Sequence, residues 1–84
     1  MTWTDNDIQM VWNKGRAVPD YDPKMWRYDS YGSPIKRDEY GNRNCKHGWE
    51  IDHIIPASAG GSDHISNLQP LQWENNVRKS DKKQ

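Results

Sequence analysis

The chain has 84 residues, which suits one small domain with a thin hydrophobic core. Its 12 basic and 12 acidic residues give a formal net charge of +0, which lacks the positive excess typical of nucleic-acid-binding domains. The sequence holds one cysteine, Cys45, so a disulfide within the chain and a cysteine-ligated zinc knuckle are both excluded. We therefore expect a single domain over residues 1–84.

The aromatic content predicts a folded domain although the mean hydropathy is only -1.25. Tryptophan can bury a large area and still use its polar N–H, so we expect the five tryptophans to build the core. The sequence has no apolar run long enough for a membrane span or a signal peptide. A lone cysteine suits a reducing compartment, and we expect a cytoplasmic protein. The expected core residues are Trp3, Trp12, Trp26, Trp49 and Trp73.

The N-terminal part begins with a helix signal and continues irregularly. Thr4 can cap a helix whose apolar residues Ile8, Val11 and Trp12 recur at helical spacing, and Gly15 can end it. Prolines and glycines interrupt the residues that follow. They predict a loop over 18–23, a helical turn over 24–26, a short irregular strand pair within 27–40 and a turn over 40–44.

The C-terminal part carries a clearer pattern. Residues 49–55 predict a strand that Pro56 closes, and residues 57–66 predict a long loop. A second strand over 68–71 and a helix over 73–80 follow. This order places Asp52 and His53 at the end of one strand, Asn67 before the next, and Asn75 and Asn76 at the helix start. A neutral imidazole can activate water, and carboxylate and amide oxygens can hold a hard cation such as Mg²⁺.

These motifs together resemble the HNH endonucleases. The matching segments are residues 49–56 (WEIDHIIP), 60–63 (GGSD) and 67–71 (NLQPL), then Asn75, Asn76 and Lys79. The resemblance covers roughly residues 48–83 and implies an α+β fold. That fold is a small ββα-metal finger over 48–83, supported by an N-terminal helix and an irregular aromatic-rich extension over 1–47.

The resemblance also implies roles for individual residues. His53 corresponds to the general base, Asp52 to the first metal ligand, and Asn67 to a brace that orients the base. Asn76 corresponds to the second metal ligand, on the helix. Asn75 competes for that role, but neighbouring helical residues point about 100° apart, and the family's spacing favours Asn76.

The last family position is asparagine here, which makes the chain an H-N-N variant of the pattern. An oxygen ligand favours one Mg²⁺ or Mn²⁺ ion over zinc, and Ni²⁺ can also substitute. Many relatives carry paired cysteines for a structural zinc, and this chain lacks them. We expect the aromatic N-terminal part to supply that support instead.

Other polar residues admit two interpretations each. Glu50 either orients the metal ligands or forms a strand ion pair, with Arg16, Arg27, Arg37 and Arg43 as candidate partners. Lys79 either contacts a backbone phosphate, with Arg78 and Lys82 extending the contact, or is a solvated charge. We expect Asp63 to serve the loop turn, His47 a turn, and His64 to be exposed.

The implied function is metal-dependent hydrolysis of DNA phosphodiester bonds, which leaves a 5′-phosphate and a 3′-hydroxyl. The expected partner is DNA, with no membrane. A homodimer or a larger protein partner is also possible, because one finger cuts one strand. The alternative functions are a non-catalytic nucleic-acid-binding module and a metal-stabilised module that binds another protein.

Overall fold

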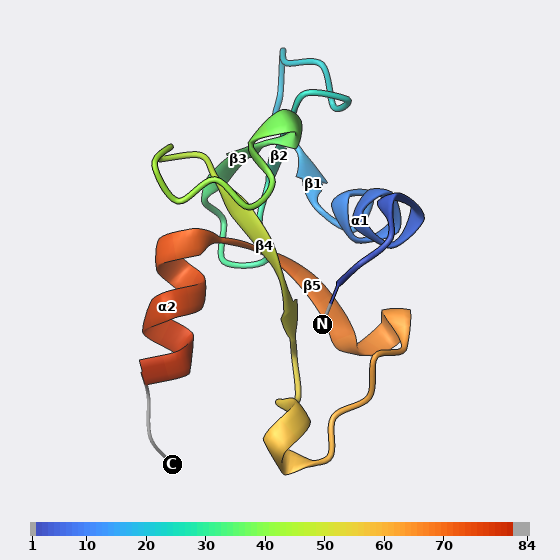
Figure 1. Cartoon of the computed structure of the whole chain (residues 1–84). Helices are drawn as coiled ribbons and strands as arrows, with labels where there is room; N and C mark the ends of the chain where they lie inside the picture. The colour runs from blue at the N-terminus through green and yellow to red at the C-terminus, as the bar shows by residue number, and fades with distance from the viewer. Residues whose placement is uncertain (1, 82–84) are drawn as a thin grey trace.

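The computed structural model describes residues 2–81, which form two helices and two antiparallel sheets (Figure 1). This architecture confirms the α+β class. The elements are α1 (Asp5–Trp12), β1 (Arg16–Ala17), β2 (Trp26–Tyr28), β3 (Pro34–Lys36), β4 (Trp49–His53), β5 (Leu68–Gln72) and α2 (Trp73–Asp81), with 3-10 turns at Arg37–Glu39, Ala57–Ala59 and Ile65–Asn67.

Helix α1 is fixed at its start by a capping box. The Thr4 hydroxyl accepts from the Asp7 backbone N–H, and the Asp7 carboxylate accepts from the Thr4 N–H, both at 3.1 Å. The predicted helix is confirmed, although it ends at Trp12 rather than at Gly15. The apolar face faces the core and comprises Ile8, Val11 and Trp12.

The region predicted as an irregular strand pair belongs to a three-stranded antiparallel sheet in the order β1-β2-β3. Strands β2 and β3 fall within or beside the predicted range. Strand β1 was not predicted, because two residues are too few to show a strand period. Residues 23–25 form a hydrogen-bonded turn rather than a helix.

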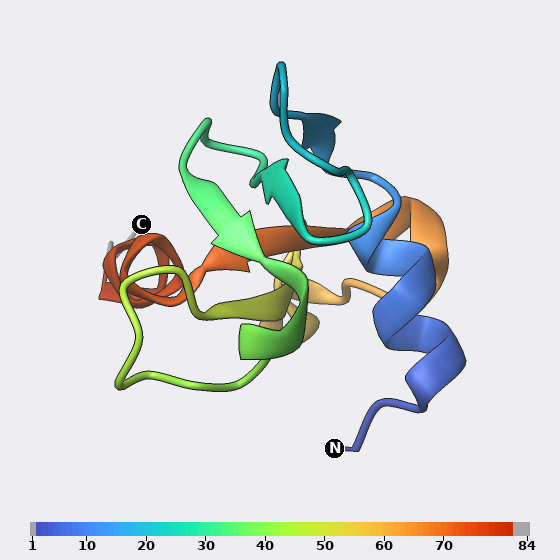
Figure 2. The same cartoon turned by 90° about the horizontal axis from the view of Figure 1, so that it is seen from above.

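Strands β4 and β5 pair antiparallel, and α2 follows β5 without a connecting loop. In this register Asp52 lies opposite Gln69, and His53 lies opposite Leu68. Figures 1 and 2 show α1 and α2 on opposite sides of this β4–β5 hairpin. The predicted strand–loop–strand–helix order is therefore confirmed, although β4 ends at His53, two residues early.

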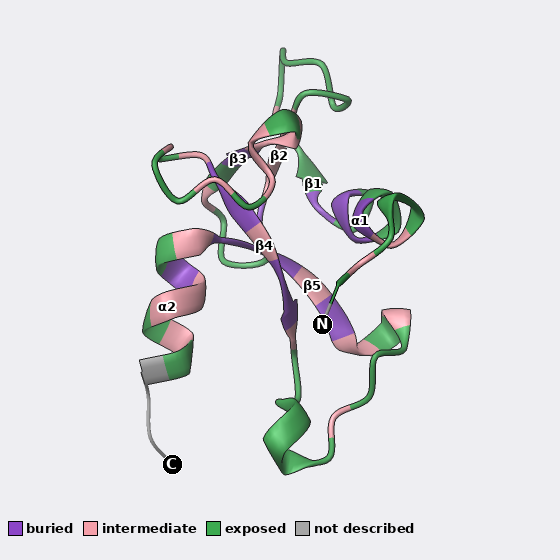
Figure 3. Cartoon of the chain, viewed as in Figure 1, coloured by how far each residue is buried: buried purple, intermediate pink, exposed green. Residues whose placement is uncertain are grey.

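The hydrophobic core lies where α1 meets the β4–β5 hairpin, and the buried segments of Figure 3 meet there. The rings of Trp12 and Trp49 lie with their centroids 5.3 Å apart. Trp3 is half-buried and packs against the core, whereas the expectation that all five tryptophans build the core is wrong for Trp26 and Trp73, which are half-buried and lie outside it. One of these, Trp73, donates its indole N–H to the Cys45 carbonyl at 2.9 Å, which keeps its ring near the surface. The buried core cluster consists of Ile8, Val11, Trp12, Ile35, Trp49, Ile51 and Leu68.

A buried polar cluster joins the turn between β2 and β3 to the start of α2. One Asp29 carboxylate oxygen accepts from the Gln72 backbone N–H at 2.8 Å and from Asn75 Nδ2 at 2.9 Å. Asn75 Nδ2 also donates to the Ser33 hydroxyl at 2.9 Å. Asp29, Gln72 and Asn75 are all buried, so these bonds fix the N-terminal sheet against the finger.

Candidate active site

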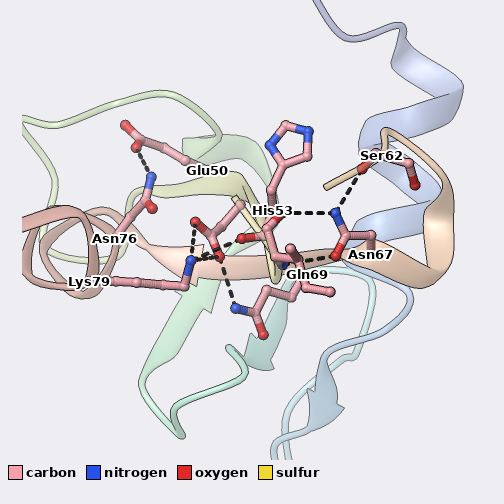
Figure 4. A network of polar contacts seen from close by, with 9 residues as sticks. Glu50, His53, Ser62, Asn67, Gln69, Asn76 and Lys79 are labelled. Atoms are coloured by element: carbon pink, nitrogen blue, oxygen red, sulfur yellow. Dashed lines mark hydrogen bonds and ion pairs between the residues drawn. The ribbon is translucent and has the colours of Figure 1, made fainter. Parts of the chain in front are cut away.

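Strand β4 presents its last residues to two different sides. Side chains alternate along a strand, and Glu50 and Asp52 contact Asn76 and Lys79 of α2. The ring of His53 points the other way (Figure 4). Asp52 is almost fully buried, at 8% exposure, and His53 is half-buried. The strand end therefore separates a carboxylate on the α2 side from an imidazole on the loop side.

The Asp52 carboxylate is held by a side chain from β5 and another from α2. Its Oδ2 accepts from Gln69 Nε2 at 2.9 Å and lies 3.2 Å from Lys79 Nζ. Lys79 Nζ also donates to the His53 backbone carbonyl at 2.9 Å. Gln69 was not singled out from the sequence, although its position opposite Asp52 in the hairpin was the signal that could have found it.

A chain of three polar side chains sets the orientation of Asn76. Arg43 binds Glu50 through two N–H groups, with Nε 2.6 Å from Oε2 and Nη2 2.8 Å from Oε1. Asn76 Nδ2 donates to Glu50 Oε1 at 2.8 Å. An ionised carboxylate only accepts hydrogen bonds, so the Asn76 amide must turn its NH₂ to Glu50 and its carbonyl oxygen away. Glu50 thus forms the expected strand ion pair, with Arg43 as its partner, and also holds the Asn76 amide.

The two side chains that bind Glu50 change its pKa. The hydrogen bonds from Arg43 lower the pKa of Glu50 below its usual value, and the bond from Asn76 adds to this against the opposing effect of burial. Glu50 in turn raises the pKa of Arg43. Glu50 is therefore ionised throughout the neutral pH range, and it accepts the hydrogen bond from Asn76 as a carboxylate.

Asn75 and Asn76 have different environments although they are neighbours. Asn75 is buried, and its amide is used by Asp29, Ser33 and Arg78. Asn76 is half-buried and lies beside Asp52 and Lys79 along the same hollow. The structure thus brings Asn76, and not Asn75, to the predicted site.

Asn67 closes the loop that follows β4. Its Oδ1 accepts from the Ile55 N–H at 2.9 Å, and its Nδ2 donates to the carbonyls of Ile55 at 3.1 Å and Ser62 at 2.8 Å. The chain passes so close here that a Cβ on Gly61 would lie 1.7 Å from the Ile55 oxygen. Asn67 therefore holds both ends of the loop without itself lining the hollow beside Asp52, which is the bracing geometry that the resemblance implied.

His53 is oriented by a residue from that loop. Its Nε2 lies 2.7 Å from Asp63 Oδ1, and its ring centroid lies 5.7 Å from that of Trp3. A carboxylate acceptor requires the proton on Nε2, which leaves Nδ1 as the basic nitrogen of a neutral ring. Asp63 was expected only to serve the loop turn. No sequence signal paired it with His53, because the loop path determines that contact.

The predicted residues converge on one hollow of about 670 Å³ between β4, α2 and the 3-10 turn at Ala57–Ala59. Arg78 does not line it, since its guanidinium turns to Asn75 instead. Lys82 lies outside the described residues. The lining residues are Ile51, Asp52, His53, Pro56, Ala57, Ser58, Ala59, Asn76, Lys79 and Ser80.

The donors around this hollow fit a hard cation with few protein ligands. Asp52 offers carboxylate oxygens and Asn76 its amide oxygen, and Mg²⁺ commonly binds through one or two such groups with water and phosphate completing its shell. Residues 2–81 contain no cluster of three or more His, Cys, Asp or Glu side chains that could hold an ion alone. An ion held by Asp52 would share the carboxylate with the ammonium of Lys79 or displace it, because Lys79 Nζ lies 3.2 Å from Oδ2 and 3.3 Å from Oδ1.

A family model described as HNH endonuclease matches residues 39–82, about half of the chain. The chain belongs to the HNH endonuclease family. This HNH domain therefore has a nuclease-type or nucleic-acid-binding function, with DNA as the substrate class that the family suggests. HNH nucleases typically use a divalent metal. No curated protein and no solved structure matches the chain. None of the helices within residues 2–81 is long and apolar enough to cross a membrane.

Proposed function

We propose that this HNH domain is a metal-dependent endonuclease that hydrolyses DNA phosphodiester bonds. The observation that carries the proposal is the convergence of Asp52, His53, Asn76 and Lys79 on one hollow, from elements that are far apart in sequence. Oxygen ligands for a cation and an ammonium group thus lie at the hollow, and His53, whose backbone carbonyl accepts from Lys79 there, carries its imidazole on the loop side of the same strand end. Phosphodiester hydrolysis needs an activated water and neutralisation of negative charge, and these groups can supply both.

His53 acts as the general base in this proposal. Asp63 accepts a hydrogen bond from the Nε2–H group and holds the ring, so Nδ1 is free to take a proton from the attacking water. Asn67 fixes the backbone at Ile55, two residues beyond His53, and so holds the loop that carries Asp63. The loop and the strand end therefore move together as one unit.

Asp52 and the Asn76 carbonyl oxygen would hold one divalent cation, with Mg²⁺ the preferred ion. When bound, such an ion stabilises the negative charge that develops on the scissile phosphate and its leaving oxygen. Gln69 keeps the Asp52 carboxylate in place from the opposite strand. Lys79, once it is displaced from Asp52, is free to contact a phosphate oxygen. The expected products are a 5′-phosphate and a 3′-hydroxyl, and one finger nicks one strand.

A plasmid-nicking assay tests this function. We expect the protein to nick supercoiled plasmid with Mg²⁺, to stop when EDTA is added, and to lose at least about 100-fold of its rate in His53→Ala. His64→Ala is the matched control, because His64 is an exposed histidine of the same loop and should retain full activity. Full activity in His53→Ala would remove His53 as the base.

A non-catalytic nucleic-acid-binding module is the second candidate. It is favoured by Lys79, whose ammonium lies 3.2 Å from Asp52 and neutralises the carboxylate without any metal. This candidate would be supported if the protein bound DNA in EDTA and left plasmid intact with Mg²⁺, Mn²⁺ and Ni²⁺.

A further inference from the structure

A second hollow, of about 330 Å³, lies on the N-terminal sheet and belongs to no part of the candidate active site. Aromatic rings from the loop before β2 and from β2 itself form much of its wall. Tyr21 is 59% exposed and contributes its ring to this hollow. The lining residues are Val18, Tyr21, Trp26, Tyr28, Pro34 and His47.

The rings in this aromatic hollow are arranged around Trp26. The centroid of Tyr21 lies 6.1 Å from that of Trp26 at an interplanar angle of 68°, and the ring of His47 lies 4.9 Å away at 79°. Cations lie over two of the rings: Lys36 Nζ is 5.9 Å from the Trp26 centroid, and Arg16 Cζ is 4.8 Å from that of Tyr28. Two edge-on rings and a lysine ammonium thus surround the indole of Trp26, while Tyr21 remains largely exposed.

A smaller hollow of about 160 Å³ adjoins this one, since both are lined by Pro34 and His47. The smaller hollow adds the cations Lys46 and Arg78. Its one acid among the described residues, Glu74, accepts a hydrogen bond from Gln72 at 3.2 Å. An aromatic hollow therefore lies next to one lined by two cations, and a base and its adjoining phosphate need such a pairing.

The two hollows lie within reach of the active site. His47 and His53 are six residues apart, and an extended chain spans at most about 3.6 Å per residue, so at most about 22 Å separates the two histidines. A stacked nucleic-acid strand rises about 3.4 Å per nucleotide, so about six nucleotides cover that distance. Arg78 also lies on α2, the helix that carries Asn76 and Lys79.

We propose that this surface is a second nucleic-acid site, which stacks an unpaired DNA base on the exposed ring of Tyr21, beside Trp26, and holds its phosphate with Lys46 and Arg78. The inference rests on the proposed function, because it identifies the DNA that the active site receives as one with a single-stranded segment nearby. Stacking on aromatic rings tolerates any base, so the site selects unpaired structure rather than sequence.

Binding measured in EDTA tests the site separately from cleavage. A fluorescently labelled single-stranded oligonucleotide and a blunt duplex of the same sequence serve as probes, read by anisotropy. We expect Tyr21→Ala to weaken single-strand binding by about 5-fold to 100-fold, to leave duplex binding within about twofold, and to be rescued by Tyr21→Phe. Tyr31→Ala is the matched control, because Tyr31 is 56% exposed and lines neither hollow.

Three results would overturn the site: no single-strand binding by the intact protein, equal losses on both probes, or no loss in Tyr21→Ala. The two proposals fail separately. If nicking requires His53 but single-strand binding does not depend on Tyr21, the second site is rejected and the endonuclease proposal is retained. Tyr21-dependent binding by a protein that never nicks would do the reverse.

Discussion

The neighbouring amides of Asn75 and Asn76 show how one residue type takes two tasks in adjacent positions. Asn75 uses its amide inside the buried cluster around Asp29, where both its donor and its acceptor are occupied. Among the contacts of the described residues, Asn76 uses only its NH₂ group, which donates to Glu50. Its carbonyl oxygen is therefore available to a ligand. The same truncation should therefore produce two different defects.

Asn75→Ala and Asn76→Ala form a matched pair that separates stability from chemistry. We expect Asn75→Ala to lower the free energy of unfolding by about 1–3 kcal/mol, because buried donors and acceptors lose their partner. Asn76→Ala should unfold like the intact protein and lose at least about tenfold of its Mg²⁺-dependent nicking rate. Urea unfolding and plasmid nicking are measured on both variants. A stable Asn75→Ala that has lost nicking, beside a destabilised Asn76→Ala that still nicks, would contradict this assignment.

The sequence predicted the residues whose roles follow from local order, and missed those whose roles depend on contacts across the fold. Asp52, His53 and Asn76 were predicted and meet at one hollow, because their strand and helix are continuous in pattern. Asp63 and Arg43 reach the site from irregular segments. No period fixes the path of such a segment, so a sequence alone cannot say where its side chains point.

The same contrast holds between elements. The finger was predicted almost to its boundaries, because Pro56, the glycine-rich loop and the breaker-free helix each carry a local signal. Its N-terminal neighbour was predicted poorly, because its strands have only two or three residues and owe their existence to pairing. Tertiary contacts, such as Asp29 with α2, decide that part of the fold.

Arg43 links an irregular segment to β4 and thereby to α2, and this link should depend on pH. The pKa of Glu50 is lower in the folded protein than in the unfolded chain, chiefly because of Arg43. Its contribution to stability is complete above the unfolded value of about 4.3 and is lost as the pH falls through the lower folded value. Removal of Arg43 removes the main cause of the lowered pKa, so the loss should begin at a higher pH.

Acid unfolding, followed by tryptophan fluorescence, measures this effect. We expect the midpoint of Arg43→Met to lie at a higher pH than that of the intact protein. Lys24→Met removes an exposed positive charge elsewhere and should leave the midpoint in place. Coincident midpoints for all three proteins would mean that the Arg43–Glu50 pair contributes nothing to stability.

At the scale of the whole molecule, the two parts of the chain share one core. Helix α1 contributes Ile8, Val11 and Trp12 to a cluster that also contains Trp49 and Ile51 of the finger. Neither part can bury these side chains without the other. We therefore propose that the chain is one domain, in which residues 1–47 support the finger as the zinc site does in many relatives.

A peptide of residues 48–84 tests this single-domain proposal. We expect it to lack fixed tertiary structure with or without Mg²⁺, because Trp49 loses its packing against Trp12 and the core loses its other half. Near-UV circular dichroism of the peptide beside the whole chain provides the measurement. A cooperative thermal transition in the peptide would show that the finger folds independently.

Asn67 ties Ile55 to Ser62, and the residues between these two points form one wall of the active-site hollow. These hydrogen bonds of Asn67 fix the two ends of the segment but do not constrain the residues between them. The Ala57–Ala59 turn can therefore be exchanged for a longer or bulkier insert while the imidazole of His53 keeps its position. The shape of this wall can thus be altered separately from the contact that orients the His53 ring.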